Sequence, residues 1–196
     1  MQQQELTVTN LSVRAVYDTL AGIVGENARN IIFRAAGLSS VLKSVPEYDW
    51  NKKYTNKQQL DIYTEIIRLV GAVGSQGILR QVGYKNAEIS TITFGVLNHL
   101  RDLASDEKFK KSLEMFSMAI NRGKVVDNGE AKAAFDVPEC LMCEGISSIK
   151  PYCAQYAGAM NFFADWAYGK GKYLVRETRC KALGEESCLF ELKERS

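Results

Sequence analysis

The chain has 196 residues, of which 46% are hydrophobic, 10% aromatic and 24% charged. This composition is that of an ordinary globular protein, and it excludes a disordered, collagen-like or disulfide-dense chain. The formal net charge of +2, from 25 basic and 23 acidic residues, gives no electrostatic reason to expect a nucleic-acid or membrane-surface partner.

The first residues, Met1–Glu5, carry neither the basic segment nor the apolar segment of a secretory signal. No apolar run approaches the roughly 18 residues that a membrane-spanning helix requires. We therefore expect a cytoplasmic protein. In that reducing compartment, patterned cysteines are more typical of metal or redox sites than of structural disulfides.

The first predicted elements are helices. Apolar residues recur every three or four positions over residues 11–36, which predicts a helical stretch that is interrupted at Gly25 and ended by Gly37. Residues 44–56 are polar and aromatic, and they predict a loop. From Lys57 the helical spacing of apolar residues returns.

A tract of mostly small residues, 71–77, follows this helix. Glycine is costly inside a helix, so we expect either close helix packing or the approach of a ligand there. A further helical region is predicted from Ala87 to Arg122, with a break near Ser105, which is a suitable N-cap. The only histidine, His99, lies in this region, and we interpret it as an ordinary helix residue rather than a catalytic base.

After Gly123 the pattern changes to strands and one further helix, for which Pro151 suits the first turn. The predicted elements are strands at 124–126 and 131–137 around a turn at 127–129, a helix at 151–168, and strands at 172–180 and 188–192. This order predicts the α+β class, as a single domain of N-terminal helices packed on a mainly antiparallel sheet with a C-terminal hairpin.

The cysteines all lie beyond residue 139, as Cys140, Cys143, Cys153, Cys180 and Cys188. Cys180 and Cys188 flank a glycine-containing turn between two predicted strands, which directs both sulfur atoms toward one point. Glu177, three residues before Cys180, brings a carboxylate to the same place. Cys153, at the start of the predicted helix, completes a set of three sulfurs and one oxygen that suits a structural zinc ion.

Other interpretations of the cysteines remain open at this point. Cys140 and Cys143 form a CxxC pair, which fits zinc binding, dithiol redox chemistry or chance. A rival metal site joins this pair with Cys180 and Cys188. Alternatively, the cysteines are buried thiols that only fill the core, since free cysteine is among the most buried residue types.

The C-terminal part resembles a known family. Its motifs are Cys143-Glu144-Gly145-Ile146, Pro151-Tyr152-Cys153, Gly158, Val175-Arg176-Glu177-Thr178-Arg179-Cys180, Leu183-Gly184-Glu185 and Cys188-Leu189-Phe190. Over residues 140–192 these motifs resemble the 4-vinyl reductase domain, also called the hydrocarbon-binding domain; upstream, only the helical architecture fits. The resemblance implies a single domain of this type over residues 1–196, with a fold similar to a subunit of the vesicle-tethering TRAPP complex.

The resemblance also implies a zinc site. In the family's aromatic-sensing transcription activators, zinc is held by Cys, Glu, Cys and Cys, which correspond in order to Cys153, Glu177, Cys180 and Cys188. The intervals agree from Glu177 onward, but the interval from Cys153 to Glu177 is one residue longer here. Cys143 is therefore the substitute for Cys153 in this ligand set.

For function, the resemblance implies a protein that holds a small hydrophobic molecule and forms a homodimer. The chain leaves no length for an ATPase or DNA-binding module, so it resembles the stand-alone members that are linked to (bacterio)chlorophyll synthesis. We expect a tetrapyrrole ligand, namely a chlorophyll-type pigment or precursor, and partners in photosystem assembly or pigment synthesis. The alternatives are a vinyl reductase, although no nucleotide or flavin motif is visible, and a ligand-free dimeric interaction module.

Large apolar side chains on the predicted helix 151–168 and just after it also suggest a ligand pocket. The residues expected to line it are Tyr156, Met160, Phe163, Trp166 and Tyr173. They suit a flat aromatic ring system, but the same helical spacing is typical of an ordinary core. Because Phe162 and Trp166 lie off the main apolar stripe, we expect this helix to be buried on more than one side, by a ligand or by a second copy of the chain.

Overall fold

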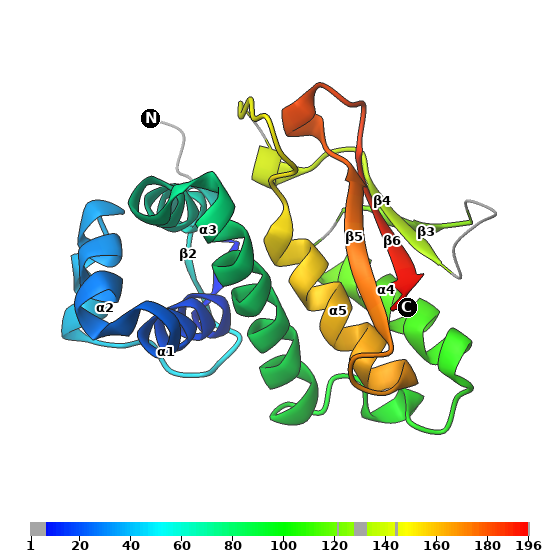
Figure 1. The fold of residues 1–196 in the computed structure, drawn as a ribbon. Coiled ribbons are helices and arrows are strands. Elements are labelled where there is room, and N and C mark those ends of the chain that lie inside the picture. The colour runs from blue at the N-terminus through cyan, green and yellow to red at the C-terminus, as the bar shows by residue number, and fades with distance from the viewer. Residues whose placement is uncertain (1–6, 121, 128–132, 144, 196) are drawn as a thin grey trace. The chain divides into compact units, whose positions relative to one another are not determined.

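The computed structural model describes residues 7–120, 122–127, 133–143 and 145–195 (Figure 1). The chain divides into two compact units, an N-terminal unit (Met1–Val82) and a C-terminal unit (Gly83–Ser196). Helices combined with antiparallel sheets confirm the predicted α+β class. The single domain over residues 1–196 and the likeness to a TRAPP subunit stay predictions. None of the helices in the described ranges is long and apolar enough to span a membrane.

The N-terminal unit is helical apart from one short pair of strands. Strand β1 (Val8–Thr9) pairs antiparallel with β2 (Lys52–Tyr54), so the predicted loop over residues 44–56 contains a strand. Helix α1 (Asn10–Ala35) begins after Thr9, whose hydroxyl accepts a hydrogen bond from the Ser12 N–H at 3.2 Å. A threonine in this position satisfies one of the amide groups that the first turn of a helix leaves unpaired. The short helix α2 (Ser39–Lys43) follows.

Two glycines break the long helices. Gly25 has φ 80° and ψ 162° inside α1, and Gly71 has φ 76° and ψ 164° inside α3 (Asn56–Ile92). This backbone region is essentially restricted to glycine, so the interruption predicted at Gly25 is confirmed and α3 consists of two helices joined at Gly71. A Cβ atom built at Gly71 or at Gly77 would meet nothing within 4 Å. These two glycines therefore do not mark the close packing that we expected for residues 71–77.

The helical region predicted from Ala87 to Arg122 is broken before Ser105 as expected, but residues 93–104 lie outside both α-helices. Helix α3 ends at Ile92, and α4 (Ser105–Ile120) begins at the predicted Ser105. Turns and the short 3-10 helix η1 (Asn98–Leu100) lie between them. Gly95, with φ 64°, adopts a left-handed conformation that stops the helix. His99 lies in η1 and is exposed, so the helix that carries this histidine is a short 3-10 helix.

The sheet of the C-terminal unit has four antiparallel strands in the order β3-β4-β6-β5. Its strands are β3 (Lys124–Val126), β4 (Ala134–Val137), β5 (Tyr173–Arg179) and β6 (Cys188–Glu194). The predicted C-terminal hairpin is the β5–β6 pair. The predicted turn at 127–129 and the first residues of the strand predicted at 131–137 fall partly at 128–132, outside the described residues.

Helices α4 and α5 (Ala154–Tyr168) pack on one face of this sheet. Phe135 of β4 and Phe190 of β6 are direct partners across the strands, so their side chains share a face. The ring of Phe116 on α4 lies 5.8 Å from that of Phe135, and the ring of Tyr156 on α5 lies 6.2 Å from that of Phe190. Both helices therefore cover the same side of the sheet.

Helix α5 is the central helix of the C-terminal unit. It begins at Ala154, three residues after the predicted start, and 11 of its 15 residues are buried, which confirms that it is covered on more than one side. The C-terminal end of α3 runs along it (Figure 1). A Cβ atom at Gly83 would lie 1.8 Å from the carbonyl oxygen of Gln155, so only glycine permits this backbone approach.

A hydrogen bond beside this contact predicts a dependence of stability on pH. The hydroxyl of Tyr84 on α3 donates to Asp165 Oδ2 of α5 at 3.0 Å, and burial, followed by this hydrogen bond, raises the pKa of Tyr84 to about 12. Because the folded pKa lies above the usual value of about 10, the stabilisation is complete below pH ~10 and is lost as the pH rises toward ~12.

We therefore expect Tyr84→Phe to lower the free energy of unfolding by about 1 kcal/mol at pH 8. The difference from the unsubstituted protein should shrink between pH ~10 and ~12. Urea denaturation of both proteins at pH 8 and at alkaline pH measures it, and a difference that stays constant across this range would contradict the prediction.

Candidate metal centre

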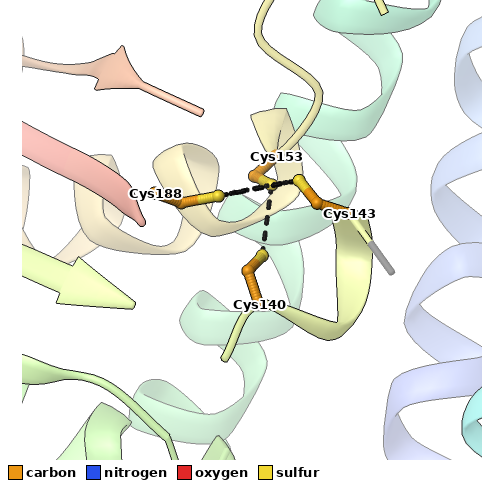
Figure 2. Close-up of side chains that lie close together, drawn as sticks. All are labelled: Cys140, Cys143, Cys153 and Cys188. Carbon is orange, nitrogen blue, oxygen red and sulfur yellow. Dashed lines mark hydrogen bonds between the residues drawn. The ribbon is translucent and has the colours of Figure 1, made fainter. Parts of the chain in front are cut away.

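The five cysteines converge in the C-terminal unit. Every one is at most 5% exposed, and they come from the segment around the 3-10 helix η2 (Leu141–Cys143), the start of α5 and the β5–β6 hairpin. Figure 2 shows four of these side chains directed toward one another. Cys153 Sγ lies 3.0 Å from Cys143 Sγ, 3.3 Å from Cys140 Sγ and 3.7 Å from Cys188 Sγ.

Local turns place the first three cysteines. The Cys143 N–H donates to the Cys140 carbonyl at 3.1 Å, and this turn brings both thiols of the CxxC pair to the cluster. Cys153 is the N-cap residue of α5, and its carbonyl accepts hydrogen bonds from the first turn of the helix. Hydrogen bonding with Cys140 and Cys143 raises the pKa of the Cys153 thiol, whereas the partial positive charge at the helix N-terminus acts in the opposite direction.

An irregularity in the β5–β6 hairpin positions Glu177 and Cys180, which are further donors of the cluster. The register of β5 against β6 shifts between Glu177 and Arg179, as in a β-bulge. Tyr173, Val175 and Glu177 alternate along the inner face of β5, and the extra residue lets Cys180, rather than Arg179, follow Glu177 on that side. The hairpin then turns through the 3-10 helix η3 (Lys181–Leu183) and Gly184, which has φ 92°.

The carboxylate of Glu177 belongs to this cluster. Its Oε2 accepts a hydrogen bond from the Cys153 N–H at 2.9 Å, whereas its Oε1 is buried and has no hydrogen-bond partner among the described residues. Burial raises the pKa of Glu177 to about 9. A buried carboxylate oxygen without a partner is costly, and a metal ion at the cluster would satisfy it.

The thiols differ in how readily they ionise. Hydrogen bonding from Cys143 lowers the pKa of Cys180 to about 6, and hydrogen bonding from Cys140 lowers the pKa of Cys188. Backbone N–H groups of Tyr152 and Lys181 also donate to Cys180 Sγ and Cys188 Sγ, each at 3.4 Å. The two hairpin cysteines are thus held toward the thiolate form, which is the form that binds metal.

The donors fall into two overlapping groups, each with ligand atoms within 4.8 Å of one another. One group is Cys153, Glu177, Cys180 and Cys188, the set that we predicted; the other is Cys140, Cys143, Cys153 and Cys188. Sulfurs around one tetrahedral zinc ion are separated by about 3.8 Å, because each Zn–S bond is about 2.3 Å. Separations of 3.0–3.7 Å and the unpartnered Glu177 oxygen therefore fit a metal ion.

Among the described residues, the CxxC pair groups with Cys188, as in the rival site, but with Cys153 in the place of Cys180, because η2 lies against the start of α5. Cys143 Sγ itself also lies 3.5 Å from Cys180 Sγ. The spacing of the cysteines could not reveal this arrangement, since it depends on the path of the chain between Cys143 and Cys153.

The five residues expected to line a ligand pocket lie in and beside α5. Tyr156, Met160, Phe163 and Tyr173 are buried, whereas Trp166 is partly exposed, with Lys108 Nζ 5.2 Å from its ring centroid. The rings of Tyr156 and Phe163 lie 5.7 and 5.8 Å from that of Phe116. These two residues thus belong to one aromatic cluster between α4, α5 and the sheet.

The chain is similar in sequence to a known protein family and to a protein of Methanocaldococcus jannaschii. Residues 134–194 match the family model of the 4-vinyl reductase domain, which confirms the resemblance predicted for residues 140–192. Over 96 residues the chain is 27% identical to the "Uncharacterized protein MJ1642" of Methanocaldococcus jannaschii; the match covers 47% of this chain and 59% of that protein. The chain thus spans about three-fifths of the length of this relative.

Solved structures share the fold at low sequence identity. An H-NOX protein from S. oneidensis, in its Fe(II)NO ligation state, superposes with a TM-score of 0.65 at 10% identity, over 96% of this chain and 100% of that one. The phenol-responsive sensory domain of the transcription activator PoxR, with phenol, gives a TM-score of 0.60 at 15% identity, over 74% and 77% of the two chains.

Proposed function

Residues 134–194 are a 4-vinyl reductase domain, and from this premise we propose that the chain binds a small hydrophobic ligand and holds a structural zinc ion. The observation that carries the proposal is the pairing of a buried thiol cluster with a helix whose body is lined by aromatic rings. Both features lie within the matched residues.

Zinc is proposed to bind Cys153, Glu177, Cys180 and Cys188, with Cys143 as the substitute ligand. These donors come from the start of α5 and from both sides of the β5–β6 hairpin. One ion would therefore tie the hairpin to the helix. Four protein ligands leave no position for a reactive water, so the ion is proposed to stabilise the fold rather than to catalyse a reaction.

The ligand is proposed to lie along α5. Aromatic side chains there offer flat apolar contacts for a ring system. The similarity in fold to H-NOX proteins, one of them a structure on haem distortion in that family, and to a sensory domain crystallised with phenol supports a small aromatic or tetrapyrrole ligand. We propose a chlorophyll-type tetrapyrrole or its precursor, acting in pigment handling or photosystem assembly.

The position of His99 limits the ways in which the chain could hold a tetrapyrrole. His99 is the only histidine of the chain, and it is exposed in η1. A histidine ligand buried beside α5 is therefore not available for the metal of a haem. The aromatic side chains, rather than a histidine–metal bond, would have to hold a tetrapyrrole ring.

Ligand binding can be measured with the emission of Trp166. The chain has two tryptophans, so in a Trp50→Phe background all tryptophan emission comes from Trp166 on α5. Titration with protoporphyrin IX should quench this emission and saturate at one molecule per chain. Phe163→Leu should weaken binding by up to about tenfold, because an aromatic contact contributes up to about 1.5 kcal/mol.

The control is Phe33→Leu in the N-terminal unit, which removes an equally buried ring and should leave protoporphyrin affinity unchanged. If phenol binds and protoporphyrin does not, the tetrapyrrole assignment is wrong. Binding of neither would favour the ligand-free interaction module, and conversion of a vinyl-bearing tetrapyrrole with added NADPH would favour the reductase.

The proposed partners include a second copy of this chain. Light scattering of the purified protein should then give twice the chain mass of 21.9 kDa. A single-chain mass at micromolar concentration would contradict the homodimer.

A further inference from the structure

The metal centre has more donors than one tetrahedral ion can use. Five thiols and the Glu177 carboxylate meet there, whereas zinc in structural sites takes four ligands. If only Cys153, Glu177, Cys180 and Cys188 bind an ion, Cys140 and Cys143 remain as buried thiols against the bound sulfurs. Their sulfur atoms lie 3.3 and 3.0 Å from Cys153 Sγ. These distances are too short for thiols that only pack against the bound sulfurs.

The two donor groups share one pair of cysteines, which forms a common edge of the two sites. Cys153 and Cys188 belong to both, and their sulfur atoms are 3.7 Å apart. The first group adds Cys140 and Cys143 to this edge, and the second adds Glu177 and Cys180. We propose that Cys140 and Cys143 complete a second metal site, so that the centre holds two zinc ions bridged by the thiolates of Cys153 and Cys188.

The number of donors suits this arrangement. Two four-coordinate ions that share two bridging sulfurs need four further terminal ligands. Cys140 and Cys143 supply the terminal pair for one ion, and Glu177 and Cys180 supply it for the other. Every donor of the cluster is then used, and none is missing.

Charge favours the same arrangement. With all six donors ionised, one divalent ion would leave about four negative charges in a site whose thiols are at most 5% exposed, which a buried environment strongly disfavours. A second divalent ion reduces the excess to about two negative charges, the same as in a zinc site of four thiolates.

One distance must change when the ions enter. Cys143 Sγ lies 3.5 Å from Cys180 Sγ, although the proposal assigns these two sulfurs to different ions as terminal ligands. Each ion draws its own terminal pair outward from the shared edge. The separation between Cys143 and Cys180 is therefore expected to increase in the metal-loaded protein.

The test is the metal content of the whole chain, expressed with zinc and purified without chelator under reducing conditions. Native mass spectrometry should find two zinc ions per chain, and Cys140→Ser/Cys143→Ser should retain one. Ser147→Ala, an exposed serine of the same loop, is the matched control and should retain two. After exchange with ¹¹³Cd, NMR should show two resonances split by coupling through the shared sulfurs.

This inference rests on the zinc site proposed above, and the outcomes separate the two. One zinc in both the unsubstituted chain and the double variant overturns the second site and leaves the first standing. Two zinc ions in both proteins, or ¹¹³Cd resonances without mutual splitting, also overturn the shared centre. No zinc in the unsubstituted chain overturns both proposals.

Discussion

Cys188→Ser is expected to release the bound metal and to lower the thermal unfolding midpoint by about 8–16 °C. Cys188 belongs to both donor groups, so its loss leaves neither group complete. The remaining buried thiolates lose the charge that neutralises them, and removing one partner of a buried ionic group costs about 4 kcal/mol. For a chain of this size, each kcal/mol shifts the midpoint by about 2–4 °C.

Metal analysis and thermal denaturation of the two proteins measure this effect. Glu186→Gln, an exposed substitution two residues away, is the control and should change stability by no more than about 0.5 kcal/mol. Addition of EDTA should destabilise the unsubstituted protein and leave the Cys188→Ser variant unaffected, which separates loss of metal from loss of packing. Full retention of zinc by the variant would contradict the assignment.

Gly83→Ala is expected to destabilise the protein by about 3 kcal/mol, the upper end of the usual cost of overpacking. The added Cβ would lie 1.8 Å from the carbonyl oxygen of Gln155 and 3.0 Å from the amide nitrogen of Ala159. Both atoms are backbone atoms of α5, so relief requires the two helices to separate rather than one side chain to rotate. The aromatic packing of α5, including the Tyr84–Phe162 contact, would be disturbed as well.

Gly77→Ala is the matched control on the same helix. This exposed position has no atom within 4 Å of the added Cβ, so the substitution should be neutral or stabilise the protein by up to about 1 kcal/mol. Urea denaturation of the two variants should therefore give changes of opposite sign. An equal change of stability in both variants would show that the backbone contact with α5 does not determine the effect of Gly83→Ala.

Several features of the fold could be predicted because their sequence signals are local. The β5–β6 hairpin follows from two apolar runs around a glycine-containing turn, and the break at Gly25 follows from the unique conformational range of glycine. The start of α4 at Ser105 follows from a good N-cap. In each case the information lies within a few residues.

Other features depend on contacts that are distant in sequence. The bulge between Glu177 and Arg179 cannot be predicted from the local strand propensity of these residues, yet it brings Cys180 to the same side as Glu177. The close approach at Gly83 depends on the position of α5, which is distant in sequence, whereas the glycines at 71–77 attract attention only by their local density. The association of Cys140 and Cys143 with Cys153 also depends on how distant segments fold back.

The strand order of the sheet has a consequence for synthesis of the protein. β6 is the last strand in the chain, but it lies between β4 and β5. A growing chain therefore cannot join these two strands into one sheet until β6 has emerged from the ribosome. Cys188 begins β6, so the sheet and the metal centre are completed in one late step. Until then β4 and β5 each present an unpaired strand edge, and nascent chains are most prone to aggregate in that interval.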